Sequence, residues 1–539
     1  MNICRINNER LLTKHYTAMK HNKPNTIKCV LATLLTICAS ACAPDEGNYS
    51  YHSLNEPDIT GVPEKMSVLI HDTISLDPSL GSNITDTDAY TYEWKVINNS
   101  GDNEVTVLSE EKRLHDEVKL NAGLYTLYFT MTDKKSGLFW RKSYALTVSD
   151  SSSEGWMVLC DADGKTRLDI ISDVTGKTYT DVLSDKGMPE LNHPYSIQYV
   201  PRNGNSDSPF YLFTADGATR LSKNNFAWQK EYAFKYEVAK STDLHPQAMV
   251  SDQSGMMRVC VSDGYAYTAS NMGIQGLFAP VNKEGCLAPF VGANVGATSY
   301  ASVYLFYDTV RKRFMSCCPF LTGLSLSDDT YHTMDEMESI ATGYKGSDMV
   351  TGNAFDAYPE GLDFVYMENT YYDPGNAKMG ITYTVLRDDN GCYLYGIQLG
   401  DMLCYADCTF VLGKAYYGDL SGCSDISRAD HFAFSSLRNY MYYSVGSDIY
   451  RVNLSEKPLK ADKQLHYEGE TITMMKFNLY QNAASTHDYD LVVATERNGQ
   501  GTLRIYDGMT GEGDFSSVKP KAYTGFAKIV DATYRERTN

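Results

Sequence analysis

From Gly155 to the C-terminus the chain repeats one pattern: a run of aromatic and β-branched residues, a turn rich in Asp, Asn or Gly, and a second such run. Strand–turn–strand units of this kind are typical of β-hairpins. The pattern occurs in GWMVLCDADGKTRLDII, FYLFTADGATRLSKN, MRVCVSDGYAYTASN, SVYLFYDTVRKRFMSC, ITYTVLRDDNGCYLYGIQL, HFAFSSLRNYMYYSVGSDIYRVN and YDLVVATERNGQGTLRIYDG. Because no convincing amphipathic helix interrupts these units, we expect an all-β fold.

The spacing of the repeats predicts a β-propeller over residues 155–539. Successive anchor residues are 54, 46, 46, 61, 68 and 59 positions apart, which fits four-stranded blades with loops. The anchors are Met157, Tyr211, Met257, Val303, Phe364, Phe432 and Leu491. Seven anchors favour seven blades, with six or eight as alternatives because the repeats share pattern more than sequence. The C-terminal FAKIVDATY is expected to supply a strand that closes the ring with the first blade.

Residues 55–149 carry a different β pattern. The segments YTYEWKV and GLYTLYFTMTD alternate strictly between apolar and polar positions, as half-buried antiparallel strands do. A Trp in a central strand, here Trp94, followed by a G-x-Y-x-L-x-F strand is typical of an immunoglobulin-like sandwich. No cysteine pair flanks Trp94, so the sandwich is expected to rely on packing alone. The Ser-rich SDSSSEG that follows is interpreted as a hinge between two modules.

The N-terminus is similar to a secretory signal peptide. Lysines precede a short apolar run, Cys29–Cys38, which is well below the ~20 residues that span a membrane. Small residues then lead to Cys42. We therefore assign residues 1–41 to a signal peptide, with translation starting at Met1 or Met19.

The segment ASAC resembles a bacterial lipobox, in which the cysteine becomes the acylated first residue of the mature protein. Cys42 is therefore the predicted lipid anchor and residues 42–54 its tether; an ordinary signal peptide cut near Ala41 is the alternative. Asp45 and Glu46 resemble the acidic signal that sends Bacteroidetes lipoproteins to the outer face of the outer membrane. The expected location is the outer membrane, with the protein facing the cell exterior.

The charge of the mature chain argues against several partners. Without residues 1–41, 42 basic and 66 acidic side chains remain, a net charge of −24. Nucleic acids and anionic lipids attract basic surfaces, so neither is an expected partner. Contact with the membrane is expected through the lipid alone.

Ionisable clusters give two weak candidates for a metal site. The stretch SLSDDTYHTMDEMES offers carboxylates and an imidazole, which suit several divalent ions, but such runs are usually solvated loops or short helices. The stretch CDADGKTRLD lacks the acids that complete an EF-hand loop, so a hairpin turn is expected there. The side chains concerned are Asp328, Asp329, His332, Asp335, Glu336 and Glu338 in the first stretch, and Asp161, Asp163 and Asp169 in the second.

Nine cysteines follow Cys42. Four of them fall within 32 residues, but no C-x-x-C pair is present, and zinc sites usually show that spacing. We therefore interpret the cysteines as buried thiols in strands and predict no metal and no cofactor. The four are Cys392, Cys404, Cys408 and Cys423.

Tyrosine is unusually frequent, with 41 Tyr against 19 Phe and 4 Trp. A Tyr ring with its hydroxyl can stack on a sugar or grip an extended peptide, although Tyr also fills sheet faces well. Two Tyr pairs, in ENTYYDPGN and GKAYYGD, lie between strand patterns, where exposure is expected. The candidate ligand-binding residues are Tyr371, Tyr372, Tyr416 and Tyr417.

The order of lipobox, acidic signal, Ig/PKD-like module with YEW, EGWMVL junction and propeller repeats resembles the PKD-like lipoproteins of Bacteroidetes. The resemblance covers essentially the whole mature chain. It implies an accessory protein encoded beside SusC/SusD-type outer-membrane nutrient importers, and it supplies no catalytic residue. No hydrolase, zinc-peptidase or nucleotide-binding motif is present either.

Three functions are compatible with these features. The first is a surface component, not an enzyme, that binds glycan or oligopeptide for a SusC/SusD-type uptake system. The second is a structural docking partner of the transporter that does not contact the ligand. The third is a hydrolase that uses carboxylates at the top of the propeller, because a fold by itself does not determine function.

Overall fold

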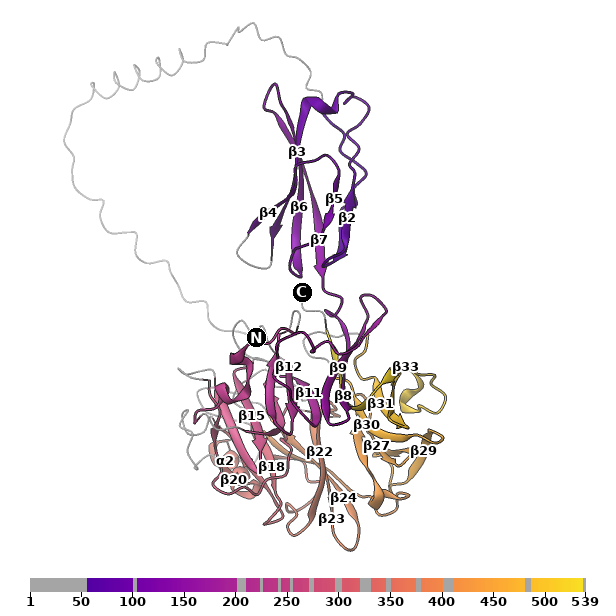
Figure 1. Ribbon diagram of the computed structural model, residues 1–539. Helices are drawn as coiled ribbons and strands as arrows, with labels where there is room; N and C mark the ends of the chain where they lie inside the picture. The colour runs from indigo at the N-terminus through magenta and orange to yellow at the C-terminus, as the bar shows by residue number, and fades with distance from the viewer. Residues whose placement is uncertain are drawn as a thin grey trace, which may run out of the picture. The chain divides into compact units, whose positions relative to one another are not determined.

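The computed structural model is all-β except for one α-helix in the described part of the chain, and it has two modules (Figure 1). Among these residues, none of the helices combines the length and apolarity needed to cross a bilayer. The predicted signal peptide, tether and anchor residues Cys42, Asp45 and Glu46 lie outside the described residues. The structure describes residues 56–99, 104–200, 210–222, 226–240, 244–252, 255–270, 276–295, 303–319, 331–345, 350–374, 380–400, 411–479 and 486–536.

The N-terminal module is a β-sandwich. Its strands are β1 (Lys65–Leu69), β2 (Thr73–Leu76), β3 (Tyr90–Asn98), β4 (Val105–Ser109), β5 (Leu114–Glu117), β6 (Gly123–Asp133) and β7 (Phe139–Ser149). One sheet has the order β1-β7-β6-β3-β4, with β1 parallel to β7, and the other is the pair β2-β5. The all-β sandwich predicted from the alternating segments is confirmed.

Trp94 is the centre of the sandwich core. Its side chain is fully buried, and its ring centroid lies 4.7 Å from that of Phe129, the residue opposite it in the register of β3 and β6. The indole Nε1 donates a hydrogen bond to the carbonyl of Lys112 at 3.1 Å. A buried indole N–H needs such a partner, so Trp94 fixes a loop as well as filling the core.

The described residues of the C-terminal module form seven sheets that follow one another in sequence, so the module is a seven-bladed propeller. Blade 1 contains β8 (Gly155–Ala162), β9 (Lys165–Ser172) and β10 (Thr178–Tyr179); blade 2 contains β11 (Pro194–Tyr199), β12 (Phe210–Thr214) and β13 (Gly217–Leu221). Blade 3 contains β14 (Pro246–Ser251), β15 (Met257–Ser262), β16 (Tyr265–Ser270) and β17 (Ala279–Pro280); blade 4 contains β18 (Tyr304–Asp308), β19 (Arg313–Cys317) and β20 (Tyr331–Thr333).

The remaining three blades are built in the same way. Blade 5 contains β21 (Val350–Thr351), β22 (Asp363–Thr370), β23 (Ile381–Arg387), β24 (Cys392–Leu399) and β25 (Leu412–Asp419). Blade 6 contains β26 (His431–Phe434), β27 (Tyr440–Val445), β28 (Asp448–Asn453) and β29 (Ala461–His466); blade 7 contains β30 (Thr471–Phe477), β31 (Leu491–Arg497), β32 (Gln500–Tyr506) and β33 (Lys521–Phe526). Each predicted anchor falls in a different blade, which explains why counting anchors gave the blade number.

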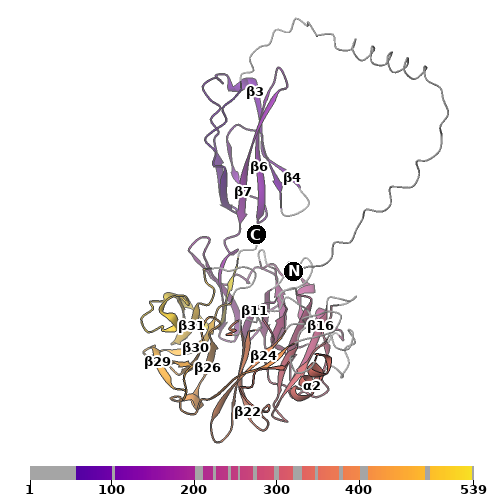
Figure 2. The ribbon, with the colours of Figure 1, turned by 180° about the vertical axis from the view of Figure 1, so that it is seen from behind.

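The ring is closed by the C-terminal strand β34 (Lys528–Arg535). It pairs antiparallel with β8 and completes blade 1 as a four-stranded sheet. Blade 1 and blade 7 therefore lie side by side, as the two opposite views show (Figures 1 and 2). The predicted closure through FAKIVDATY is confirmed.

Buried apolar side chains fill the spaces between blades. In the described residues, seven hydrophobic clusters each join two successive blades, and the last of them joins blade 7 to blade 1. In β12, Phe210 and Leu212 pack towards blade 1, whereas Tyr211 and Phe213 pack towards blade 3. Because both faces of such a strand are buried, its sequence is a continuous run of apolar residues.

The expectation that the propeller contains no convincing helix is wrong at one place. The helix α2 (Met334–Lys345) follows β20 in blade 4. Its first turn is a capping box, in which the backbone N–H of Thr333 donates to Glu336 Oε2 at 2.7 Å and the N–H of Glu336 donates to Thr333 Oγ1 at 3.3 Å. The acidic run that begins this helix therefore caps it.

Candidate functional site at the channel mouth

A cavity of about 330 Å³ opens at one end of the propeller channel, where β11, β14 and β30 end. The first strands of propeller blades surround a central channel, so residues far apart in sequence meet here. The cavity is lined by Ile197, Gln198, Tyr199, Met249, Val250, Ser251, Val295, Tyr371, Lys476, Phe477, Asn478, Leu479 and Thr533. Aromatic, amide, hydroxyl and aliphatic groups together suit a polar ligand with an apolar face.

An ion pair holds Lys476, one of the polar residues that line this cavity. Lys476 Nζ, on β30, donates to Asp531 Oδ1, on β34, at 2.6 Å. The other carboxylate oxygen of Asp531 accepts from the backbone N–H of Ile197 at 2.8 Å and from Ser196 Oγ at 3.0 Å. Three blades, 7, 1 and 2, are thus joined at one carboxylate. These charged groups are already held in place, so they can hydrogen-bond to a ligand without a change of side-chain conformation.

Gln198 extends this network to the cavity surface. Its Nε2 donates to Ser196 Oγ at 3.1 Å, while the rest of the amide is half-exposed in the lining. A ligand hydroxyl or amide that bonds to Gln198 is therefore coupled to Asp531 through Ser196.

Glu368, on β22, is a second carboxyl among the first strands of the blades. Its Oε2 accepts from the hydroxyl of Tyr366 at 3.1 Å and from the backbone N–H of Phe434 at 3.2 Å. Burial raises the pKa of Glu368 to about 8, and these two hydrogen bonds and the charge of Lys476 oppose the shift only in part. Glu368 therefore carries a proton at neutral pH.

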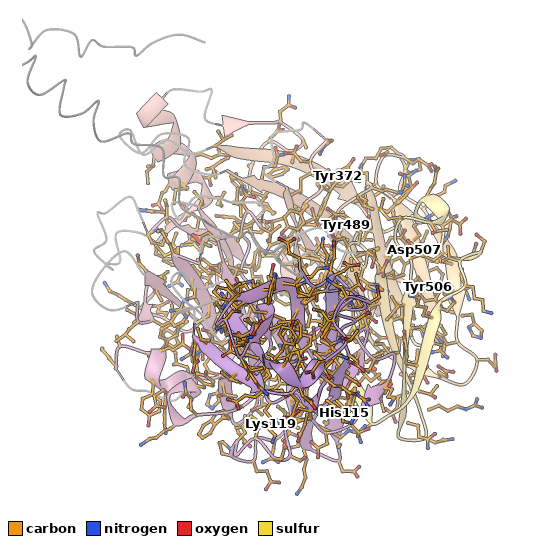
Figure 3. The ribbon with its side chains drawn as sticks, turned by 90° about the horizontal axis from the view of Figure 1, so that it is seen from above. His115, Lys119, Tyr372, Tyr489, Tyr506 and Asp507 are labelled. Carbon is orange, nitrogen blue, oxygen red and sulfur yellow. The ribbon has the colours of Figure 1, made fainter. Side chains whose placement is uncertain are left out.

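Of the four predicted tyrosines, Tyr371 reaches the cavity. It directly follows β22, and its backbone N–H donates to Ser436 Oγ at 2.9 Å, which holds the segment at the channel mouth. Its neighbour Tyr372, labelled in Figure 3, packs half-buried against the hydrophobic cluster between blades 5 and 6. Burial raises the pKa of Tyr372. The two residues thus have different environments although they are adjacent.

The prediction that Tyr416 and Tyr417 lie between strands is wrong, because both belong to β25 and pair with β24. Tyr416 donates to the carbonyl of Leu454 at 2.9 Å, and Lys457 Nζ lies 4.6 Å from its ring centroid. Tyr417 is 38% exposed, and its ring centroid lies 5.3 Å from that of Tyr395. Neither tyrosine lines the cavity.

The predicted hairpin turn in CDADGKTRLD is confirmed. Asp163 and Gly164 both have positive φ, as a two-residue turn between β8 and β9 requires, and Asp161 Oδ1 accepts from the N–H of Gly164 at 2.6 Å. Asp169 instead forms a salt bridge with Arg167, its Oδ2 lying 2.6 Å from Nη2.

The other predicted metal candidates are spread over several environments. Glu338 accepts from Tyr358 at 2.8 Å, and Asp328 and Asp329 lie outside the described residues. Cys392 and Cys423 are free and buried, whereas Cys404 and Cys408 also lie outside. No group of three or more possible metal-ligating side chains occurs among the residues the structure describes.

The sequence analysis missed Lys476, Asp531, Gln198 and Glu368. Ser196 and Asp531 are 335 positions apart in the chain, so no local motif contains both. One signal was present, because Lys476 and Asp531 each stand between apolar residues within a strand, in TITMMKF and KIVDATYR. A charged residue in such a strand needs a partner when it is buried.

Comparison with known proteins recognises the first part of the chain. Residues 42–189 match the PKD-like family. The match covers the sandwich and continues into blade 1. No curated protein matches the chain.

Several solved structures are similar at low identity. A quinoprotein alcohol dehydrogenase-like protein from Bacteroides thetaiotaomicron is 13% identical with a TM-score of 0.42, over 89% of this chain and 99% of that one. A putative TolB from Agrobacterium tumefaciens is 10% identical with a TM-score of 0.30, over 53% and 84%. A putative 6-phosphogluconolactonase from Bacteroides uniformis is 7% identical with a TM-score of 0.26, over 83% and 99%. These likenesses are too distant to assign chemistry to this chain.

Proposed function

We propose that this protein is a surface lipoprotein that binds a glycan or an oligopeptide at the channel mouth and assists a SusC/SusD-type outer-membrane importer. The observation that carries the proposal is the cavity itself, in which Tyr371 lies among amide, hydroxyl and ion-paired groups. The lipobox at Cys42, the acidic residues Asp45 and Glu46, and the PKD-like match support the cellular setting.

The chemistry of the cavity favours capture and release. An aromatic ring can stack on a sugar face or a peptide group, and Gln198 and Asn478 can hydrogen-bond to hydroxyls or amides. At about 330 Å³, the cavity is at the small end of ligand pockets. We therefore expect weak binding of one end of a longer ligand, which the importer then takes over.

The test combines two measurements on the mature protein. The first is co-purification of a transporter pair with the lipoprotein from detergent-solubilised outer membranes. The second is a calorimetric screen of oligosaccharides and peptides. Binding together with co-purification supports the proposal. Co-purification without any ligand favours the structural docking partner instead.

A hydrolase is the second candidate, because Glu368 carries a proton at neutral pH and Asp531 is held by four hydrogen-bond donors, three of them on the first strands of blades 7 and 2. Those donors are Lys476 Nζ, Ser196 Oγ and the backbone N–H groups of Ile197 and Ala532. Two carboxyl groups in different environments are the requirement for acid–base hydrolysis of a glycoside. The wild-type protein would then hydrolyse a bound oligosaccharide, and both Glu368→Gln and Asp531→Asn would lose this activity. Such a result would favour the hydrolase over the binding function.

A further inference from the structure

A second cavity, of about 690 Å³, lies at the opposite end of the strands of blade 7. It opens where β26, β30 and β34 begin, whereas the channel-mouth cavity lies where β30 ends. The two ends of β30 are about 20 Å apart at the usual rise per residue, and the cavities share no lining residue. This cavity is lined by His431, Gly469, Thr471, Ile472, Thr473, Glu496, Arg497, Asn498 and Lys528.

Two cations, Arg497 and Lys528, line this cavity. In the described part of the chain, neither Arg497 nor Lys528 has a carboxylate oxygen within 4 Å. Arg497 contributes to lowering the pKa of Glu470, but Arg504 donates to both oxygens of that carboxylate, at 2.8 and 2.9 Å. Because the chain has a formal net charge of −19, two unpaired cations at one cavity are a specific feature and not an excess of basic surface.

Gly469 and Thr473 form part of the cavity wall. Thr473 Oγ1 is buried and has no hydrogen-bond partner among the described residues. Gly469 has φ of +69°, and a Cβ at this position would lie 3.3 Å from Arg497 Nη2. The glycine therefore leaves room for the guanidinium.

The remaining ionisable groups leave the cavity with a positive balance. Glu496 Oε1 accepts from the N–H of Gly499 at 3.0 Å, which commits this oxygen to the turn between β31 and β32. His431 Nε2 donates to the carbonyl of Ile472 at 3.2 Å, and burial lowers the pKa of His431, so that it is neutral at pH 7. Arg497 and Lys528 then outweigh the single charge of Glu496.

We infer that this cavity binds the carboxylate or sulfate group of an acidic saccharide. The guanidinium of Arg497 can hold two oxygens of such a group, and Lys528 adds a second charge. The hydroxyl of Thr471 and the amide of Asn498 can bond to the sugar ring, and the volume is much larger than a bare ion needs. A free inorganic anion, such as phosphate or sulfate, can bind to the same two cations. The inference goes beyond the proposed function and does not depend on it.

The test is isothermal titration of the mature protein with trigalacturonate, with the neutral sugar galactotriose, and with inorganic phosphate and sulfate, at low salt and at 0.15 M salt. We expect trigalacturonate to bind at both salt concentrations. Arg497→Gln and Lys528→Gln should each weaken its binding roughly ten-fold, the usual effect of losing a charge-assisted hydrogen bond. Glu496→Gln keeps an acceptor for Gly499 and removes the opposing charge, so it should tighten binding several-fold.

The matched controls are Arg428→Gln and Lys519→Gln, which remove exposed cations that do not line the cavity. They should leave the affinity unchanged. Equal losses in these controls and in the cavity variants would show nonspecific attraction and overturn the inference. So would equal binding of galactotriose, or binding of phosphate and sulfate without trigalacturonate. Failure of the Tyr371 cavity to bind any ligand would leave this result intact, because no residue is shared.

Discussion

His487 Nε2, in the segment before β31, lies 3.3 Å from Asp173 Oδ2, in the turn after β9, and this contact joins the last blade of the propeller to the first. His487 Nδ1 lies 2.9 Å from Asp490 Oδ2, and the hydroxyl of Tyr534 donates to Asp173 Oδ2 at 2.8 Å. The imidazole also packs edge-on against Trp156, at 5.6 Å between centroids. Hydrogen bonds between β34 and β8 close the ring, and the cluster of His487, Asp173 and Asp490 strengthens this closure at one side. Tyr489, Tyr506 and Asp507, which belong to blade 7 like His487, are labelled in Figure 3.

The first prediction concerns the pH dependence of this closure. Burial alone would lower the pKa of His487, but the bonds to Asp173 and Asp490 outweigh it and raise the pKa to about 9. Since the pKa is higher in the folded state, the stabilisation is complete below about pH 6.5 and is lost as the pH rises through 9. His487→Gln should lower the free energy of unfolding of the propeller by about 1–2 kcal/mol at pH 6, allowing for solvent screening, and by much less at pH 10.

Scanning calorimetry at both pH values measures this difference. His245→Gln is the control, because His245 is partly exposed and lies 3.4 Å from the more exposed Asp263. An identical loss of stability at pH 6 and pH 10 in His487→Gln would mean that the side chain acts through packing and not through its charge.

The second prediction concerns Trp94 and the independence of the two modules. Trp94→Ala removes a fully buried indole and should destabilise the sandwich by about 3–5 kcal/mol. The propeller transition should stay in place, because its clusters are built from residues after Gly155. Trp140→Ala is the matched control, since Trp140 is only half-buried. Loss of both calorimetric transitions together in Trp94→Ala would show a single cooperative unit.

The parts of the fold that the sequence predicted are those set by local pattern. Alternation placed Trp94 and Val96 in the core, and seven strand–turn–strand units gave seven blades. The Asp163–Gly164 turn was predictable because its two positive φ angles favour Asp and Gly. These features depend on residues within one hairpin, so a single strand pair is enough to recognise them.

The channel-mouth site depended on long-range pairing and was not predictable in this way. Its residues come from blades 1, 2, 3, 5 and 7, and ring closure brings them together. Tyr416 and Tyr417 were misplaced because Gly413 and Gly418 on either side resemble loop signals. Gly418, and Gly396 opposite Tyr416 on β24, instead lie close to other side chains. A Cβ on Gly418 would lie 2.7 Å from Leu459 Cδ1, and one on Gly396 would lie 2.7 Å from Tyr416 Cβ. Glycine here permits close packing and does not mark a turn.

The third prediction concerns the proposed anchor. Cys42→Ala should give an unlipidated protein that is released in soluble form or stays as an uncleaved precursor. Replacing Asp45 and Glu46 with Ala should keep the lipid and reduce display at the cell surface. Protease treatment of intact cells, followed by immunoblotting, distinguishes these states. Wild-type protein that is fully protected from the protease would contradict the surface location.

The fourth prediction concerns Glu368. Burial raises its pKa to about 8, so the folded protein holds a proton that the unfolded chain releases near pH 4.5. Stability is therefore lost as the pH rises from about 4.5 through 8, by on the order of 2 kcal/mol after discounting for solvent screening of the half-buried side chain. Glu368→Gln keeps the shape of the protonated acid and should flatten this slope. Chemical denaturation at pH 5 and pH 8.5 measures the effect; an unchanged slope in the variant would contradict it.

The last prediction separates the two tyrosine pairs, which have the same composition and different positions. Tyr371 lines the cavity, whereas Tyr417 lies on β25 with its ring against Tyr395. Tyr371→Ala should weaken binding of a glycan or peptide found in the screen by about 0.5–1.5 kcal/mol, which is roughly two- to ten-fold, because a stacking face is lost. Tyr371→Phe should keep most of the affinity if the ring face is what binds. Tyr417→Ala removes an equally large, partly exposed ring and should not change the affinity, as measured by isothermal titration. An equal loss in Tyr417→Ala, or no loss in Tyr371→Ala, would move the binding site away from the channel mouth.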